Sequence, residues 1–143
     1  MRNFSAICVD ANLVIQLATS IGTSSVPDLW EQWRDEQRRI IAPMLIRYEV
    51  TNALHRYARA GMLTDEEVSD ALTIAMDIPL HLYSAARIHV RAINLASRFA
   101  LPAAYDAHYL AVADQENAEF WTTDQRLFNT VSASLPWVRL VSP

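Results

Sequence analysis

The sequence predicts one α/β domain in which helices cover both faces of a mostly parallel sheet of four to five strands, giving three layers in the order α/β/α. Three observations support this fold class. Short apolar runs typical of buried strands alternate with longer segments of helical periodicity along the chain. The length of 143 residues suits one hydrophobic core. No internal repeat or linker divides residues 1–143, so we expect a single domain.

Local signals delimit the elements of the first part of the chain. Asp10 is expected to open the first helix directly after a buried strand, and Pro27 stands in the first turn of the second helix. Pro43 is expected to begin a long helix, and Gly61 ends it as a cap. In order, we expect a strand at 4–9, a helix at 10–18, a loop at 21–25 containing Gly22, a helix at 27–38, a strand at 40–41 and a helix at 43–61.

The second part of the chain continues the alternation. Thr64 and Glu67 have the spacing of a capping box, which opens the next helix. Pro79 lies near the start of the third expected strand, and Pro102 follows the end of a helix. In order, we expect a helix at 64–77, a strand at 78–82, helices at 84–99 and 106–117, a strand at 119–123, a helix at 125–132 and a strand at 138–141.

Composition narrows the function classes. All 12 basic residues are Arg, which excludes a lysine nucleophile or Schiff base, and any phosphate contact would use guanidinium groups. The net charge of −4 argues against a non-specific nucleic-acid coat protein, although not against a nuclease. Cys8 is the only cysteine, and we expect it in the core of the first strand. Without a signal peptide or membrane-spanning pattern, we expect a cytoplasmic protein with no membrane contact.

Four acidic residues stand in unusual settings: Asp10, Glu49, Asp106 and Asp124. Asp10 and Asp124 close strand-like runs, Asp106 opens a helix, and Glu49 lies within a largely apolar helix. Each Asp alone is also a suitable helix cap, and a lone helix Glu is usually solvated. The carboxyl ends of parallel strands meet at one edge of a sheet, so the fold should bring the three Asp residues together there.

Grouped carboxylates repel one another, and a hard divalent cation such as Mg²⁺ or Mn²⁺ is the simplest group that offsets the repulsion. Such an ion makes water a better nucleophile and stabilises charge on a phosphoryl oxygen. The acids therefore indicate metal-assisted hydrolysis of a phosphodiester. A haloacid-dehalogenase-like phosphatase is excluded, because it needs Asp-x-Asp after the first strand and a Lys, whereas this chain has Asp10-Ala11-Asn12 and no Lys.

Four motifs surround these acids in order along the chain: Val9-Asp10-Ala11-Asn12, Glu49-Val50-Thr51-Asn52-Ala53-Leu54, Tyr105-Asp106-Ala107-His108-Tyr109-Leu110-Ala111 and Thr122-Thr123-Asp124-Gln125-Arg126-Leu127. Together they resemble PIN-domain ribonucleases, in particular the toxins of VapBC-type toxin–antitoxin pairs. The resemblance covers essentially the whole chain. It implies a PIN-like three-layer fold and a Mg²⁺- or Mn²⁺-dependent endoribonuclease, with Asp10, Glu49, Asp106 and Asp124 as metal ligands and catalytic acids.

Several neighbours of the acids are candidates for supporting roles. Asn12 stands where the family more often has Ser or Thr. Asn52 follows Glu49 by three positions and can orient it, or it can simply bond to the backbone. Thr122 and Thr123 either contact the metal site or only suit a strand. Arg56 shares the helix face of Glu49 and is a candidate RNA contact. Further arginines, including Arg34, Arg38 and Arg39, either line an RNA-binding rim or are solvated.

Two hypotheses about the function remain open, one of an enzyme and one of a binding module. The first is a metal-dependent endoribonuclease acting as the toxin of a VapBC pair, or as a stand-alone PIN nuclease in RNA processing. The second is a non-catalytic PIN-fold module that binds RNA or protein. The resemblance also implies a cognate antitoxin, which would dock near residues 11–38, and a homodimer.

Overall fold

The computed structural model describes residues 5–19, 21 and 24–141. The expected start of the first strand at Phe4 and the expected loop residue Gly22 lie outside these residues. Within the described part, five strands form one sheet and seven helices pack around it. None of the described helices is long and apolar enough to cross a membrane.

The sheet is entirely parallel, with strands in the order β3-β2-β1-β4-β5. Its central strand is β1, in which Cys8 lies in register with Ile41 of β2 and Phe120 of β4. The predicted fold class and strand number are therefore confirmed. The strands are β1 (Ala6–Val9), β2 (Arg39–Pro43), β3 (His81–Tyr83), β4 (Glu119–Thr122) and β5 (Val138–Leu140).

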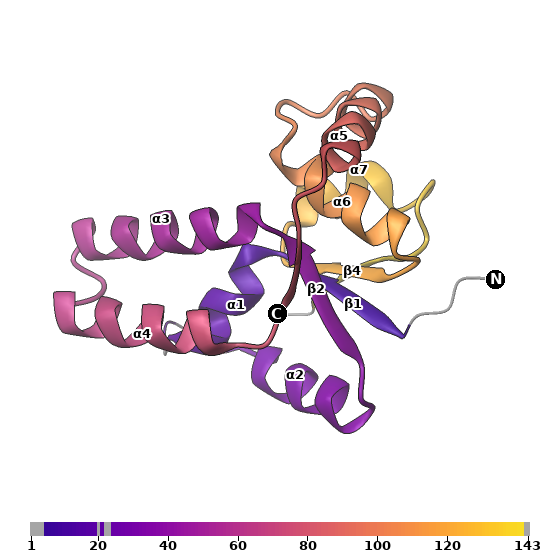
Figure 1. Ribbon diagram of the computed structural model, residues 1–143. Helices are drawn as coiled ribbons and strands as arrows, with labels where there is room; N and C mark the ends of the chain where they lie inside the picture. The colour runs from indigo at the N-terminus through magenta and orange to yellow at the C-terminus, as the bar shows by residue number, and fades with distance from the viewer. Residues whose placement is uncertain (1–4, 20, 22–23, 142–143) are drawn as a thin grey trace.

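Helices cover both faces of the sheet (Figure 1). On one face, Trp33 of α2 meets Trp121 of β4, with ring centroids 5.5 Å apart. On the other, Tyr109 of α6 stacks on Phe120 of the same strand at 5.8 Å. The first layer contains α1 (Ala11–Ala18), α2 (Val26–Asp35), α3 (Leu45–Arg59) and α4 (Asp65–Asp77), and the second contains α5 (Ala86–Arg98), α6 (Tyr105–Gln115) and α7 (Gln125–Val131).

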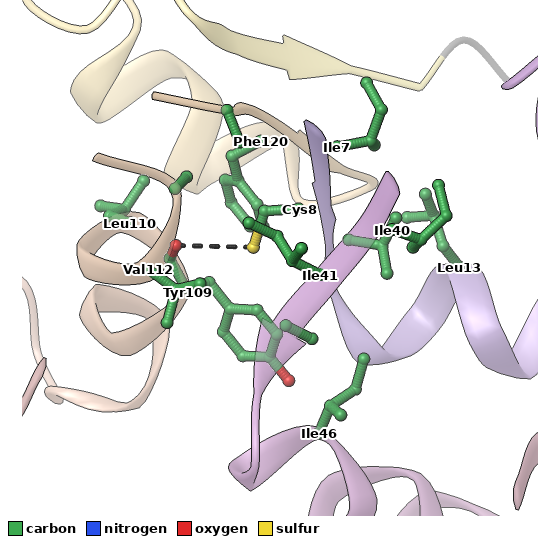
Figure 2. Packing of buried hydrophobic residues seen from close by; sticks show 14 of the residues in the cluster. Ile7, Cys8, Leu13, Ile40, Ile41, Ile46, Tyr109, Leu110, Val112 and Phe120 are labelled. Atoms are coloured by element: carbon green, nitrogen blue, oxygen red, sulfur yellow. Dashed lines mark hydrogen bonds between the residues drawn. The ribbon is translucent and has the colours of Figure 1, made fainter. Parts of the chain in front are cut away.

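The core surrounds the central strands and includes residues of α1 and α3 as well as α6 (Figure 2). Continuous apolar runs form β1 and β2 because both of their faces are covered by helices. Cys8 is fully buried, as expected, and its thiol donates a weak hydrogen bond to the carbonyl of Tyr109 at 3.7 Å. Burial, followed by the charge of Asp10, raises the pKa of the Cys8 thiol well above its ordinary value, which makes the residue a structural one.

Several expected boundaries are wrong, including the end of the second helix, which was expected at 38 and lies at Asp35. The long helix does not begin at Pro43, which instead ends β2 in register with Tyr83, and α3 begins at Leu45. Pro43 has no N–H, and Met44 supplies the next donor by bonding to the carbonyl of Tyr83 at 2.9 Å. The third strand starts at residue 81 rather than 78, because Ile78 caps α4 and a proline follows it.

The expected end of the long helix and the expected start of the next one are confirmed. Gly61 has a φ of +75° just beyond the end of α3, and its N–H bonds to the carbonyl of Ala58 at 3.0 Å. Thr64 and Glu67 form the expected reciprocal capping box at the start of α4. These two features end α3 and begin α4, so the two helices run side by side (Figure 1). This arrangement leaves the start of α3, with Glu49, at the edge of the sheet.

Candidate active site

Asp10 lies at the carboxyl end of the central strand and caps α1. Its Oδ1 accepts a hydrogen bond from the N–H of Leu13 at 3.2 Å. Its Oδ2 accepts from the Thr122 hydroxyl at 2.6 Å and from the N–H of Thr123 at 3.3 Å. Burial raises the pKa of Asp10 from 3.8 to about 6, although these hydrogen bonds act in the opposite direction. The carboxylate is thus positioned firmly, but its charge is poorly solvated.

Thr122 connects two of the acids. It is the last residue of β4 and only 1% exposed. Its hydroxyl donates to Asp10 and accepts a hydrogen bond from the backbone N–H of Asp124 at 3.0 Å. One hydroxyl proton and one lone pair are therefore used at the same time. Because β1 and β4 are neighbours in the sheet, this hydroxyl fixes the relative positions of Asp10 and Asp124.

Asp124 was expected from its sequence position to be both a helix cap and a candidate metal ligand, and its geometry is compatible with both roles. As the N-cap of α7, its Oδ1 accepts a hydrogen bond from the N–H of Leu127 at 3.0 Å. The side chain is exposed, and the described residues give its Oδ2 no hydrogen-bond partner. Capping thus uses one carboxylate oxygen and leaves the other available to a ligand.

Asp106 is the second residue of α6 and makes no capping hydrogen bond. Part of its side chain is exposed, yet the surrounding protein still desolvates the carboxylate and raises its pKa. The negative charges of Asp124 and then Glu49 raise the pKa of Asp106 further. The three carboxylates therefore lie within one another's electrostatic field, although they come from three separate helices.

Glu49 lies in the second turn of α3 and is positioned by Tyr109 of α6. The Tyr109 hydroxyl donates to Oε1 of Glu49 at 2.5 Å. Tyr109 is 2% exposed, and Figure 2 shows its hydroxyl on the side of Ile46, which also belongs to α3. Burial raises the pKa of the Tyr109 phenol well above its ordinary value, and the charge of Glu49 raises it further. The phenol therefore stays protonated and acts as a donor.

The other candidate residues lie in different environments. Asn12 donates from Nδ2 to the Thr123 hydroxyl at 2.7 Å, which links the start of α1 to the end of β4. Asn52 and Arg56 are exposed on α3, and the described part of the chain gives neither side chain a hydrogen bond or ion pair. Both are therefore accessible to a ligand.

Two of the arginines that were candidates for an RNA-binding rim lie away from the acids. Arg38 bonds to Glu119 at 3.3 Å, and Arg39 to Glu116 at 3.4 Å. Arg39 begins β2 and Glu119 begins β4, so these ion pairs lie at the amino ends of the strands. The acids lie at the carboxyl ends. Of the two roles left open for Arg38 and Arg39, a place on the rim of this site is ruled out, because both are ion-paired at the opposite edge of the sheet.

The donor set suits a hard divalent cation, because it consists of carboxylate oxygens. None of the four acids forms an ion pair within the described part of the chain. As they stand, however, no three acidic, histidine or cysteine side chains among the described residues form a group that could hold an ion.

Sequence comparison identifies the family. The family model of the PIN domain matches residues 7–133, which span all four acids. The chain belongs to the PIN domain family. Ribonuclease VapC3 of Pyrobaculum aerophilum is 33% identical to this PIN domain over 88 residues, which are 58% of this chain and 64% of that protein. The match thus spans a little under two thirds of the length of that ribonuclease.

Solved structures share the fold of this PIN domain. A toxin–antitoxin complex from Klebsiella pneumoniae contains a chain with a TM-score of 0.64 and 20% identity, covering 93% of this chain and 95% of that one. VapBC2 from Rickettsia felis, bound to a DNA fragment from its promoter, gives a TM-score of 0.67 at 13% identity, covering 96% and 99%. At these identities the likeness shows the fold alone.

Sequence reasoning missed the contribution of Tyr109 to this site. Tyr109 lies in the helix of Asp106, three positions later, and its ring was expected only as part of a motif. A signal was present, because a tyrosine within an apolar helix usually finds a partner for its hydroxyl when it is buried. The identity of that partner, Glu49, depends on how α3 and α6 meet, which the sequence pattern alone does not reveal.

Proposed function

We propose that this protein is a divalent-metal-dependent endoribonuclease and the toxin of a VapBC-type toxin–antitoxin pair. The observation that carries the proposal is the coupling of Asp106 with Asp124 and Glu49, beside a half-buried Asp10, at the carboxyl edge of a PIN-domain sheet. The ribonuclease name of the VapC3 relative supports RNA as the substrate.

Asp10, Glu49, Asp106 and Asp124 are the proposed ligands of Mg²⁺ or Mn²⁺. When bound, such an ion supplies positive charge at the scissile phosphate and lowers the pKa of an attacking water. The protein's own contribution is to hold the carboxylates. Thr122 fixes Asp10 and the start of α7, and Tyr109 fixes Glu49.

The supporting polar groups have proposed roles around these acids. Asn12 holds the Thr123 hydroxyl and thereby the segment between β4 and α7. Asn52 and Arg56 are exposed one and two turns beyond Glu49 on α3, where they can meet the RNA backbone. Arg56 brings a guanidinium that no acidic side chain of the described residues neutralises.

An antitoxin and a second copy of the chain are the proposed protein partners. The toxin–antitoxin and VapBC titles of the structural neighbours support an antitoxin. The helices of residues 11–38 are its proposed docking region, and the proposed location of the complex is the cytoplasm. A pulldown with the product of the neighbouring reading frame tests this role. Specific binding supports a toxin, and its absence, with RNA cleavage retained, favours a stand-alone nuclease.

The activity is tested by cleavage of structured and single-stranded RNA with Mg²⁺ or Mn²⁺. Wild-type protein should cleave, EDTA should stop cleavage, and Asp10→Asn should lose it with the fold retained. Asp70→Asn is the matched control, since Asp70 is exposed on α4. Full cleavage by Asp10→Asn, or in EDTA, contradicts the proposal.

A non-catalytic binding module is the second candidate. The observation that favours it is that no three ligating side chains among the described residues converge closely enough for an ion. Calorimetric titration with Mn²⁺ separates the two candidates, because a module without a metal site binds no Mn²⁺ and the nuclease does.

A further inference from the structure

A cavity of about 290 Å³ lies beside the acidic site at the same edge of the sheet. Its floor is formed where β2 and β3 end, at Pro43 and Tyr83, and β2 is the direct neighbour of β1. The first turn of α3, with Tyr48, and the facing helices α5 and α6 supply its walls. The volume is close to the lower end of the roughly 300–1,000 Å³ of small-molecule sites.

The cavity shares two elements with the acids. Tyr48 precedes Glu49 on α3, and His108 follows Asp106 by two positions on α6. A ligand group in the cavity therefore contacts the same two helices, α3 and α6, that carry Glu49 and Asp106. Among the described residues that line it, none is acidic, so an anionic ligand repelled by free carboxylates meets no such repulsion there.

One wall of the cavity contains a hydrogen-bonded pair of imidazoles. His108 Nδ1 lies 2.7 Å from the carbonyl oxygen of Ala104, so this nitrogen carries the proton. His108 Nε2 then accepts, when the ring is neutral, from Nδ1 of His89 at 2.9 Å. This tautomer, assigned from the hydrogen bonds, leaves Nε2 of His89 as an acceptor with no partner among the described residues. His89 is exposed and lines the cavity, so it can bond to an incoming group.

The other wall offers an aromatic face. Tyr48 is 70% exposed and Met44 is 38% exposed, which is unusual for large apolar side chains beside a cavity. Aromatic faces and polar ring edges together are the features that bind a single-stranded nucleobase, through stacking and hydrogen bonds to the base edge. An acceptor such as His89 Nε2 can take a hydrogen bond from an exocyclic amino group or a ring N–H of the base.

We propose that this cavity binds the base of a nucleotide adjacent to the scissile phosphate, with Tyr48 stacking on the base and His89 bonding to its edge. The proposal rests on the ribonuclease function proposed above and deepens it. It assigns selection of the cleavage site to a surface separate from the four acids. The alternative occupant, a second copy of the chain covering Tyr48 and Met44, is an outcome of the test.

The test compares RNA with a base at each flanking position against RNA that is abasic at that position. Wild-type protein should cleave the complete RNA at least about fivefold more efficiently than one abasic substrate, since stacking of one base contributes roughly 1–3 kcal/mol. Tyr48→Ala should cleave the complete and the abasic RNA with equal efficiency. Tyr48→Phe should retain the wild-type difference because the ring remains. His89→Ala should flatten the base preference at that position.

His55→Ala is the matched control, because His55 is exposed on α3 outside the cavity, and it should behave as wild type. If wild-type protein cleaves no RNA with Mg²⁺ or Mn²⁺, the ribonuclease function and the base pocket are both refuted. If Tyr48→Ala cleaves with an unchanged base preference, only the pocket is refuted. If that variant turns a dimer into a monomer with its preference intact, the cavity belongs to an interface between copies and the proposal is overturned.

Discussion

The Tyr109 hydroxyl donates a hydrogen bond to Oε1 of Glu49, although the two residues are 60 positions apart in the chain. Tyr109 is buried and stacks on Phe120 of β4, so its hydroxyl has little freedom to move. The hydrogen bond therefore connects Glu49, on one layer of helices, to the core beneath the opposite layer. It gives a mid-helix carboxylate the fixed position that a metal ligand requires.

Tyr109→Phe should weaken the site without unfolding the protein. The substitution keeps the buried ring and removes only the hydroxyl, so Glu49 loses one donor worth about 1 kcal/mol or somewhat more. We expect a loss of roughly tenfold in divalent-ion affinity and in kcat/KM for RNA. A metal titration of activity measures both. Phe99→Leu at the half-buried C-cap of α5 serves as the aromatic control, and unchanged metal dependence in Tyr109→Phe would show that the hydroxyl has no positioning role.

Thr122→Val should cost stability as well as metal affinity. Valine has nearly the same shape but leaves Asp10 Oδ2 without its hydroxyl donor and the N–H of Asp124 without its acceptor. Oδ2 keeps the N–H of Thr123, so the N–H of Asp124 is the group left unsatisfied, and we expect a loss of about 1–3 kcal/mol in urea unfolding. Thr130→Val on exposed α7 is the matched control, since its hydroxyl bonds only to the carbonyl of Arg126. Equal stability of the two variants contradicts the proposed bridge.

The raised pKa of Asp10 predicts a specific pH dependence in metal-free protein. The folded protein holds the proton more tightly, with a pKa of about 6 against 3.8 in an unfolded chain, so ionised Asp10 disfavours folding. The free-energy cost of folding with Asp10 ionised is absent below pH 4 and grows as the pH rises to 6. Above pH 6 it stays constant at roughly 3 kcal/mol. In EDTA, Asp10→Asn should therefore gain stability relative to wild type between pH 4 and 6, as measured by urea unfolding. A difference that is flat over this interval contradicts the prediction.

The strand–helix alternation is enough to predict the sheet and the edge at which the three Asp residues lie. Asp10 and Asp124 directly follow strands, and Asp106 is in the first turn of a helix, so their positions follow from parallel topology. The pattern does not give the strand order, which decides that β4 lies next to β1. The two hydrogen bonds through which Thr122 links Asp10 to Asp124 form because β4 lies beside β1. The spacing of these residues in the sequence could not predict them.

Glu49 illustrates the other limit of sequence reasoning. Periodicity places it on a helix, but the direction in which α3 leaves the sheet determines whether it meets the acids, and that direction depends on tertiary packing. The same limit applies to Arg38 and Arg39, for which the sequence left an RNA-binding rim and a solvated position open, and which are ion-paired at the edge opposite the acids. Charge type alone does not tell which end of a strand a residue will occupy.

Calorimetric titration of Mn²⁺ into wild-type protein, Asp106→Asn and Asp70→Asn at pH 7.5 tests directly whether the acids at the carboxyl edge of the sheet together bind a divalent cation. Wild-type protein and Asp70→Asn should show the same saturable binding, and Asp106→Asn should bind at least about tenfold more weakly, because it lacks one charged ligand. Absence of saturable binding in wild-type protein, or equal affinity in all three proteins, would contradict the claim.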